Sequence, residues 1–403
     1  MAERSREIDE TARLLAAVER HAPDAIALAR FMAENPEIAL EEREASARYA
    51  AWLERLGFSV VRASAGLETA FVARRGGPAP LRIALLAEMD ALPEIGHACG
   101  HNLSGPASLL AAAAIVEVLA PGSVEVLVVG CPAEEIGLGK RRLVEAGTFE
   151  GVHAALMAHA SDMRRAHRLF LGNRKFELVY LGRAAHAAAY PEEGVNALDG
   201  VVQLLVGIGL LRQQLSRSAR VHAIVSEGGR SPNVIPERAV AKVWVRALDD
   251  VTLESVTQRV LACARGAAEA SGTRLEVVET PGTSPPMRPN LALAALYRRQ
   301  LERLGLRETD HPPDAKIGSS DITHVSRVVP TIHPNFPIGE RLELHTREFA
   351  RAAASESGRA GLLEAARALS LTVAELARSP EAREAVAREA ASGRATQPVA
   401  PTR

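Results

Sequence analysis

The order of the expected elements predicts an α/β fold, in which a mostly parallel mixed sheet carries helices on both faces. Two observations support this prediction. Short apolar runs bounded by turns alternate with helical stretches over residues 1–167, and polar clusters follow several of these runs, where open α/β sheets keep their chemistry. The apolar runs that we expect to form strands are 58–62, 69–73, 81–86, 124–130 and 153–160.

Helical spacing of apolar residues predicts the helices between these strands. The first covers residues 8–33, with a break expected near Pro23, because proline removes a hydrogen bond and crowds the preceding turn. The second covers residues 42–56 and ends before Gly57. A third follows the polar segment after strand 81–86 and ends at Leu119, before a Pro-Gly turn.

After His167 the pattern changes to β-α-β-β-α-β, which predicts an inserted ferredoxin-like α+β domain over residues 168–281. The first domain, residues 1–167, is expected to resume over residues 282–380. Residues 381–403 are rich in Ala, Arg and Pro and are expected to form a flexible tail. Within the inserted domain we expect strands at 169–181, 221–227, 239–248 and 274–278 and helices at 195–215 and 253–270, and beyond it helices at 291–304 and 361–377 and a strand at 328–334.

The composition of the 403 residues is ordinary for a water-soluble globular protein, with 24% charged residues and a net charge of −1. This charge balance predicts neither a nucleic-acid nor a membrane partner. The three cysteines are too few and too scattered for a disulfide framework, which favours a reducing compartment. The N-terminal segment is charged, and no run approaches the ~20 apolar residues that span a bilayer. We therefore expect a cytoplasmic protein that acts on a small-molecule substrate.

The segment Leu86–Asn102, with the sequence LAEMDALPEIGHACGHN, is the first polar cluster after a predicted strand. Cys99 and His101 are two residues apart, and a thiolate and an imidazole at that spacing can bind one or two metal ions. The alternative is that Cys99 is an inert buried thiol and His101 caps the helix that follows.

Three further clusters follow later strands or loops. Glu134 and Glu135 come four residues after a strand, so that one carboxylate can bind a metal while the other acts as a general base. His159 ends the next apolar run, and His345 follows Pro- and Gly-rich loops. Taken alone, the paired Glu residues can also form a solvated turn and the histidines can be structural. Together with Cys99 and His101, the set suits two borderline divalent ions better than magnesium or calcium.

These segments, together with GRAAHAAAYPEEGVNALD, SPNVIPE, GSSDITHVSRVVPTIHP and HTREF, resemble in order the motifs of the aminoacylase/carboxypeptidase G metallopeptidase family. The resemblance runs from about Leu81 to Ser355 and is strongest to the amidohydrolase branch, in particular to its aminobenzoyl-glutamate utilisation B and aminoacylase-1-like-2 groups. It implies a di-zinc exopeptidase-like fold with the inserted domain as a lid, through which the chain forms a homodimer or a higher homo-oligomer.

The resemblance also implies roles for individual residues. It implies two divalent ions, zinc or manganese, with Glu134 as general base and Asp90 as the carboxylate that orients a metal ligand. His186 matches a histidine that reaches a substrate oxyanion, in its own active site or in a neighbouring one, and Asn233 matches a substrate-binding asparagine. The positions that match the family's metal ligands are Cys99, His101, Glu135, His159 and His345, and the pocket-lining loop includes Gly318, Ser319 and Ser320.

The expected activity is metal-dependent hydrolysis of an amide C–N bond in an N-acyl amino acid, an aryl-amido amino acid or an unusual dipeptide. Two alternatives stay open: an aromatic aminohydrolase that releases ammonia from the same metal site, and a catalytically inactive binding subunit of the same fold.

One departure from the family's motifs bears on the substrate. Ile136 and Leu138 replace glycines that follow the paired Glu residues in close family members, which should narrow this loop and make it more apolar.

Overall fold

The computed structural model describes residues 2–310 and 317–395. They form two compact units. The first unit runs to Leu169 and resumes at Arg288 and again at Ser320. The second comprises Phe170–Met287 and Ile317–Ser319. Each unit has its own cluster of buried apolar side chains, so each is described separately.

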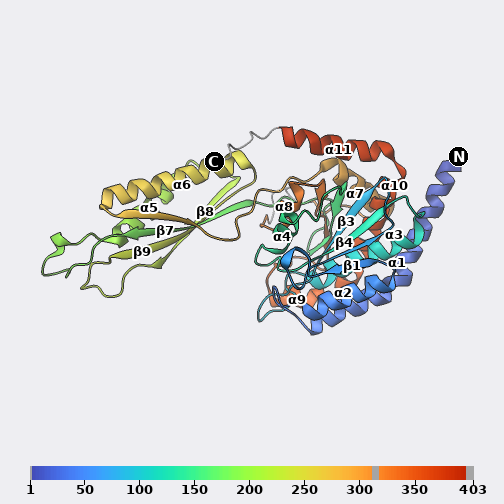
Figure 1. Cartoon of the computed structure of the whole chain (residues 1–403), viewed down its shortest axis with the longest axis horizontal. Coiled ribbons are helices and arrows are strands. Elements are labelled where there is room, and N and C mark those ends of the chain that lie inside the picture. The colour runs from blue at the N-terminus through green and yellow to red at the C-terminus, as the bar shows by residue number, and fades with distance from the viewer. Residues whose placement is uncertain (1, 311–316, 396–403) are drawn as a thin grey trace. The chain divides into compact units, whose positions relative to one another are not determined.

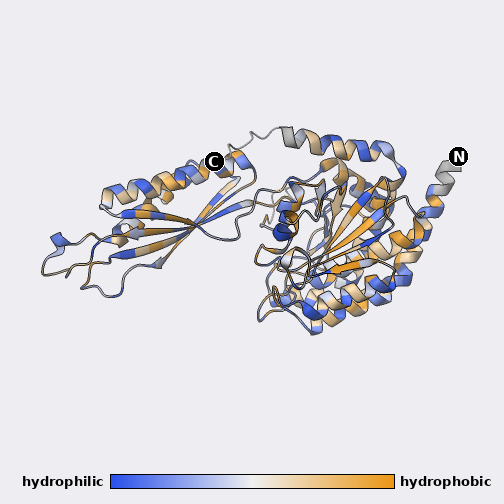
Figure 2. Ribbon diagram, in the orientation of Figure 1, coloured by the Kyte–Doolittle hydropathy of each residue, from blue (hydrophilic) through white to orange (hydrophobic). Residues whose placement is uncertain are grey.

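The first unit is built on a six-stranded sheet with the order β1-β2-β4-β3-β5-β11 (Figure 1). The pairs β4–β3, β3–β5 and β5–β11 are parallel, and β1 and β2 run antiparallel at one edge. This confirms the mostly parallel mixed sheet. Figure 2 shows β3 and β4 as largely apolar, as expected for strands buried on both faces. The bounds are β1 Ser59–Arg62, β2 Phe71–Arg75, β3 Arg82–Glu88, β4 Glu125–Cys131, β5 Ala154–Leu156 and β11 Thr331–Ile332.

Helix α3, His101–Val118, lies against β3 and is itself covered by α1, Ala2–Glu34, and α10, Glu356–Arg378. Its alanine run, 111–114, is fully buried, and the small side chains allow close packing of the neighbouring helices. The break expected near Pro23 is wrong, because α1 is continuous through that residue. Pro23 lies on the exposed side of α1, where the missing backbone hydrogen bond faces solvent.

The remaining helices of the first unit pack around the sheet and around α10. Residues 381–395 of the expected flexible tail form, together with Pro380, the helix α11. Glu389 of this helix accepts hydrogen bonds from the backbone N–H groups of Leu291 and Ala292 at the start of α7. Residues 396–403 of that tail lie outside the described residues. A short parallel pair, β6 His159–Ser161 with β12 Asn335–Pro337, continues past the main sheet. The other bounds are α2 Arg43–Arg55, η1 Ser64–Gly66, α4 Gly139–Glu145, α7 Leu291–Arg303, α8 Ile322–Ser326, α9 Arg347–Ala353 and α11 Pro380–Ala395.

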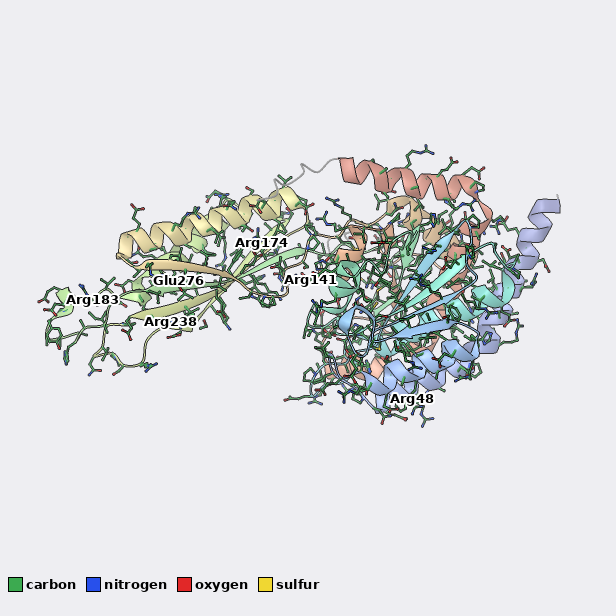
Figure 3. All side chains as sticks on the ribbon, viewed as in Figure 1. Arg48, Arg141, Arg174, Arg183, Arg238 and Glu276 are labelled. Carbon is green, nitrogen blue, oxygen red and sulfur yellow. The ribbon has the colours of Figure 1, made fainter. Side chains whose placement is uncertain are left out.

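The second unit has the element order β-α-β-β-α-β and a four-stranded antiparallel sheet with the order β10-β7-β9-β8, as the ferredoxin-like prediction requires. Helices α5 and α6 pack on one face of this sheet. Charged residues such as Arg174, Arg238 and Glu276 project from its strands (Figure 3). The bounds are β7 Gly172–Leu181, η2 Pro191–Glu193, α5 Ala197–Arg212, β8 Ala219–Glu227, β9 Arg238–Ala247, α6 Asp250–Ser271 and β10 Arg274–Glu279.

Among the described residues, no helix combines the length and the apolar character that crossing a bilayer requires.

Candidate metal centre

The polar clusters of the first unit meet at one edge of the parallel part of the sheet. Glu88 is the last residue of β3, Glu134 and Glu135 follow the end of β4, and His159 begins β6 just after β5. Because β3, β4 and β5 run in the same direction, their carboxyl ends lie together. Topology thus brings together side chains that are more than seventy positions apart in the sequence.

Cys99, in the loop before α3, and His101, the first residue of α3, lie at the same edge of the sheet. Gly100, between them, has a φ of 86° and precedes the first residue of the helix. A Cβ at this position would lie 2.6 Å from the Cβ of Ala160. Glycine therefore lets the loop pass close to β6 in a left-handed conformation, and this places the Cys99 thiol beside His159.

Two imidazoles in the cluster are held by their Nδ1 atoms. His101 Nδ1 lies 2.8 Å from the backbone oxygen of Asp90, and His159 Nδ1 lies 2.8 Å from that of Ala160. A carbonyl oxygen can only accept, so each Nδ1 carries the hydrogen and each Nε2 keeps a lone pair. His159 Nε2 is 3.5 Å from Cys99 Sγ. The potential ligand atoms of Cys99, His101 and His159 all lie within 4.8 Å of one another.

A second group shares Cys99 and adds Glu135 and His345. His345 Nε2 is 3.5 Å from Glu135 Oε2. The backbone of His345 has a φ of 63°, uncommon for a residue other than glycine, and its N–H donates to the Ala98 oxygen at 2.9 Å. This bond ties the loop before α9 to the Cys99 segment. His345 is half exposed, whereas the first group is buried.

Asp90 contacts His101 of the first group of potential ligands and Glu135 of the second. Its Oδ1 lies 3.2 Å from His101 Nδ1, and its Oδ2 accepts the backbone N–H of Glu135 at 2.9 Å. Burial acts to raise the pKa of Asp90, but its contact with His101 lowers the pKa below its usual value. Asp90 thus contacts one member of each group of potential metal ligands.

Glu134 lies beside both groups, with Oε2 3.9 Å from His101 Nε2. Burial, and then the negative charge of Glu88, raise the pKa of Glu134 well above its usual value. The Glu134 carboxylate therefore has a raised proton affinity and lies next to potential metal ligands.

The charge balance of the cluster fits bound cations. Burial and the Glu135 carboxylate raise the pKa of Cys99, so the thiolate needs a nearby positive charge. Burial acts to lower the pKa of His101, but the negative charges of Glu88 and Cys99 raise the pKa well above its usual value. The surroundings of His101 Nε2 therefore favour a positive charge. The buried atoms His101 Nε2, Glu88 Oε2 and Glu135 Oε1 lack a hydrogen-bond partner among the described residues. The donor types, thiol, imidazole and carboxylate, suit zinc and similar ions.

His186 and Asn233 belong to the second unit and are adjacent within it. The backbone N–H of Ala187 donates to the backbone oxygen of Asn233 at 3.0 Å, and His186 forms an isolated β-bridge with Val234. His186 is exposed, and its Nδ1 lies 3.3 Å from the Ala188 nitrogen. The structure thus brings these two residues into one exposed region of that unit.

The expected pocket-lining loop is divided between the two units. Gly318 and Ser319 belong to the second unit and hydrogen-bond to Leu171, just before its first strand. The backbone oxygen of Gly318 accepts the Leu171 N–H at 2.9 Å, and Ser319 Oγ donates to the backbone oxygen of Leu171 at 3.1 Å. Ser320 belongs to the first unit, just before α8.

Two buried residues of the cluster, Glu88 and Lys140, were not assigned from the sequence, and Asp321 was expected only as the last residue of the pocket-lining loop. Lys140 Nζ lies 2.6 Å from Glu88 Oε1 and also contacts Asp321 Oδ1. Burial acts to raise the pKa of Glu88, but Lys140 and then His101 lower it below its usual range. A signal for Glu88 was present in the sequence, since it is a carboxylate of the polar segment Leu86–Asn102, two positions before Asp90.

Comparison with known proteins identifies the family. The chain is 37% identical over 378 residues to the Xaa-Arg dipeptidase of Mus musculus, and the match covers 90% of this chain and 88% of that protein. A model of the M20 peptidase dimerisation domain matches residues 171–271. The chain belongs to the M20 peptidase family. It is therefore a hydrolase, and the family expected from the motifs is confirmed.

Two further proteins are similar to the chain at lower coverage or lower identity. The chain is 36% identical over 265 residues to a p-aminobenzoyl-glutamate hydrolase subunit of Escherichia coli (strain K12), and this match covers 60% of the chain and 55% of that protein. A crystal structure from Bacillus subtilis, described as a dinuclear metal-binding peptidase of the M20 family, aligns with a TM-score of 0.69 and 22% identity over 89% of this chain and 99% of its own. This second match supports the fold.

Proposed function

We propose that this M20 hydrolase is a dinuclear metallo-dipeptidase that cleaves the amide bond of dipeptides with a basic C-terminal residue. The observation that carries the proposal is the pair of overlapping groups of potential metal ligands, which share Cys99 and have Glu134 beside them. One group comprises Cys99, His101 and His159, and the other Cys99, Glu135 and His345.

In this proposal each group holds one divalent ion, zinc or manganese. Two ions bound there would supply an acidified water and polarise the scissile carbonyl. Asp90 fixes the His101 ring and the Glu135 backbone and so keeps one member of each group in place. The Nδ1 contacts of His101 and His159 keep their Nε2 lone pairs directed at the ions.

Glu134 moves the proton. Its Oε2 accepts a proton from the attacking water and delivers it to the leaving nitrogen, which makes the amine a viable leaving group. We assign His186 as a donor to the developing oxyanion, in its own active site or in a neighbouring one, on the family resemblance of its motif. On the same ground we assign Asn233, with Gly318, Ser319 and Ser320, to substrate binding.

The substrate class comes from the similarity to the mouse Xaa-Arg dipeptidase, which extends over nine tenths of the chain. The shorter match to the p-aminobenzoyl-glutamate hydrolase subunit makes aryl-amido glutamates the second candidate. Ile136 and Leu138 lie in the turn after Glu135, and Ile136 is half exposed. Their apolar side chains favour a substrate with an apolar group near the scissile bond.

The test is metal analysis of the purified protein, followed by a release assay. The panel contains Xaa-Arg and Xaa-Lys dipeptides, p-aminobenzoyl-glutamate and N-acyl amino acids, with the free amino acid measured by mass spectrometry. We expect about two ions per chain and fastest release from the basic dipeptides. Release of ammonia instead of an amino acid would support the aminohydrolase alternative. Full metal content without turnover on any substrate class would favour the binding-subunit alternative.

We also propose that the second unit forms a homodimer through α5 and the edge strand β8. Val202, Val206 and Leu210 are spaced four residues apart on α5 and are 49%, 58% and 70% exposed. Ile224, 61% exposed, lies on β8, which ends the sheet and presents unpaired backbone groups. An apolar helix stripe beside an open strand edge is suited to pairing with a second copy of itself.

The double substitution Val206→Glu/Leu210→Glu is expected to convert the dimer to a monomer, because it places charges in a desolvated interface. The measurement is molar mass by light scattering after size-exclusion chromatography. Val251→Glu, at an exposed valine on α6, is the matched control and should leave the mass unchanged. If the double variant keeps the wild-type mass, α5 is not part of the interface.

A further inference from the structure

Glu88 presents one of its carboxylate oxygens to the candidate metal centre. The side chain is fully buried at the end of β3. Its Oε1 accepts a hydrogen bond from Lys140 Nζ at 2.6 Å. Its Oε2 has no hydrogen-bond partner among the described residues and lies 3.3 Å from His101 Nε2 and 4.0 Å from His159 Nε2. A buried carboxylate oxygen without a donor is costly unless a cation binds it.

Lys140 and Asp321 hold Glu88 in this orientation. Lys140 is fully buried, and Asp321 contacts its ammonium group through Oδ1 and accepts its backbone N–H through Oδ2 at 2.8 Å. One ammonium between two carboxylates leaves one surplus negative charge. Asp321 uses both of its oxygens on Lys140, whereas Glu88 uses only one. The surplus charge is therefore available at Glu88 Oε2, on the side of the two imidazoles.

The distances match those between ligands of one ion. Donors about 2.0–2.2 Å from a tetrahedral zinc lie roughly 3.3–3.6 Å from each other. Glu88 Oε2 is 3.3 Å from His101 Nε2, within this range, and 4.0 Å from His159 Nε2, slightly beyond it. Cys99 Sγ is 3.5 Å from His159 Nε2. Cys99, His101 and His159 alone would give three protein donors, and Glu88 adds a fourth at a comparable spacing.

We propose that Glu88 is an additional ligand of the ion held by Cys99, His101 and His159, bound through Oε2, and that Lys140 with Asp321 positions it. This inference rests on the proposed metal-dependent function. It gives this ion a second anionic ligand, in addition to the Cys99 thiolate. The competing explanation is that Glu88 serves only to neutralise Lys140, with no direct bond to a metal.

Three variants separate these explanations. Glu88→Gln removes the charge but keeps the shape and one acceptor for Lys140. Asp321→Asn removes the charge of the other carboxylate that contacts the same ammonium group. Glu88→Asp keeps the charge but withdraws the oxygens by one methylene. Zinc affinity is measured by competition with a chromophoric chelator, and the absorption spectrum of the cobalt(II)-loaded protein reports a change of ligands.

We expect Glu88→Gln to weaken one of the two zinc sites by about 100-fold or more, since loss of groups that merely support a ligand already costs roughly 10–100-fold. Glu88→Asp should weaken the same site and alter the cobalt spectrum. Asp321→Asn removes only a group that supports Glu88, so it should weaken this site by roughly 10-fold and keep the wild-type spectrum. Circular dichroism checks that each variant is folded.

Two results would overturn the inference. In one, Glu88→Gln and Glu88→Asp bind both ions as wild type does. In the other, Glu88→Gln and Asp321→Asn weaken zinc binding equally, which would indicate charge balance around Lys140. If Glu88→Gln does not fold, the comparison of Glu88→Asp with Asp321→Asn decides in the same way. A wild-type protein that binds no zinc or manganese would instead overturn the proposed function.

Discussion

Glu134→Gln is expected to lower kcat by about 10²–10⁴-fold, the usual contribution of a general acid–base group. The amide side chain has nearly the same shape but cannot accept the proton of the attacking water. Neither of the two groups of potential ligands that share Cys99 contains Glu134, so the metal content should stay at the wild-type level. The measurements are steady-state kinetics on the best substrate of the release assay and elemental analysis of the same preparation.

The neighbouring residue gives the matched control. Glu135→Gln removes a carboxylate that lies 3.5 Å from His345 Nε2 and belongs to the second group. It should lower the metal content as well as kcat, and added metal should restore part of the activity. Added metal should have no such effect on Glu134→Gln. A fully active Glu134→Gln variant would show that the general base lies elsewhere.

Cys99→Ala is expected to weaken the binding of both ions, because Cys99 is the residue that the two groups share. Truncation leaves the first group with two imidazoles and the second with one carboxylate and one imidazole, and it removes an anionic donor from each. We expect less than one tightly held ion per chain and loss of nearly all activity at micromolar metal. Elemental analysis after dialysis measures the first, and activity over a metal titration measures the second.

Cys131→Ala is the control for Cys99→Ala. Cys131 is another buried thiol of the first unit, but its Sγ lies 3.2 Å from the Val129 backbone oxygen and it belongs to neither group. Its truncation should leave both ions bound. If Cys99→Ala also keeps both ions after dialysis, Cys99 is not a ligand, and the proposal of two sites with a shared thiolate fails.

Local patterns in the sequence were sufficient for much of the architecture. Strands such as β3 and β4 are continuous apolar runs, because both faces are buried, and a run of this kind can be recognised without knowing its neighbours. The predictions failed where the environment outweighed the local pattern. Pro23 does not interrupt α1 because it faces solvent, and residues 380–395 form a helix that packs against α7 despite their weakly apolar composition.

The residue types and their order along the sequence were enough to predict a hydrolase of this family. A thiol, imidazoles and paired carboxylates follow the ends of predicted strands, and their order along the chain identified the family before any coordinates. Residue types and short spacings are local properties, so they can be read directly.

Which of these groups lie close together depends on how the strands and loops pack in three dimensions. Parallel strands bring Glu88, Glu135 and His159 to one edge, and a strained backbone turn brings His345 to them from a distant loop. The buried contacts of Lys140 with Glu88 and Asp321 join residues up to 181 positions apart, and nothing in the local sequence distinguishes this lysine from an exposed one. Such contacts depend on the relative placement of whole elements, which the packing of the core determines.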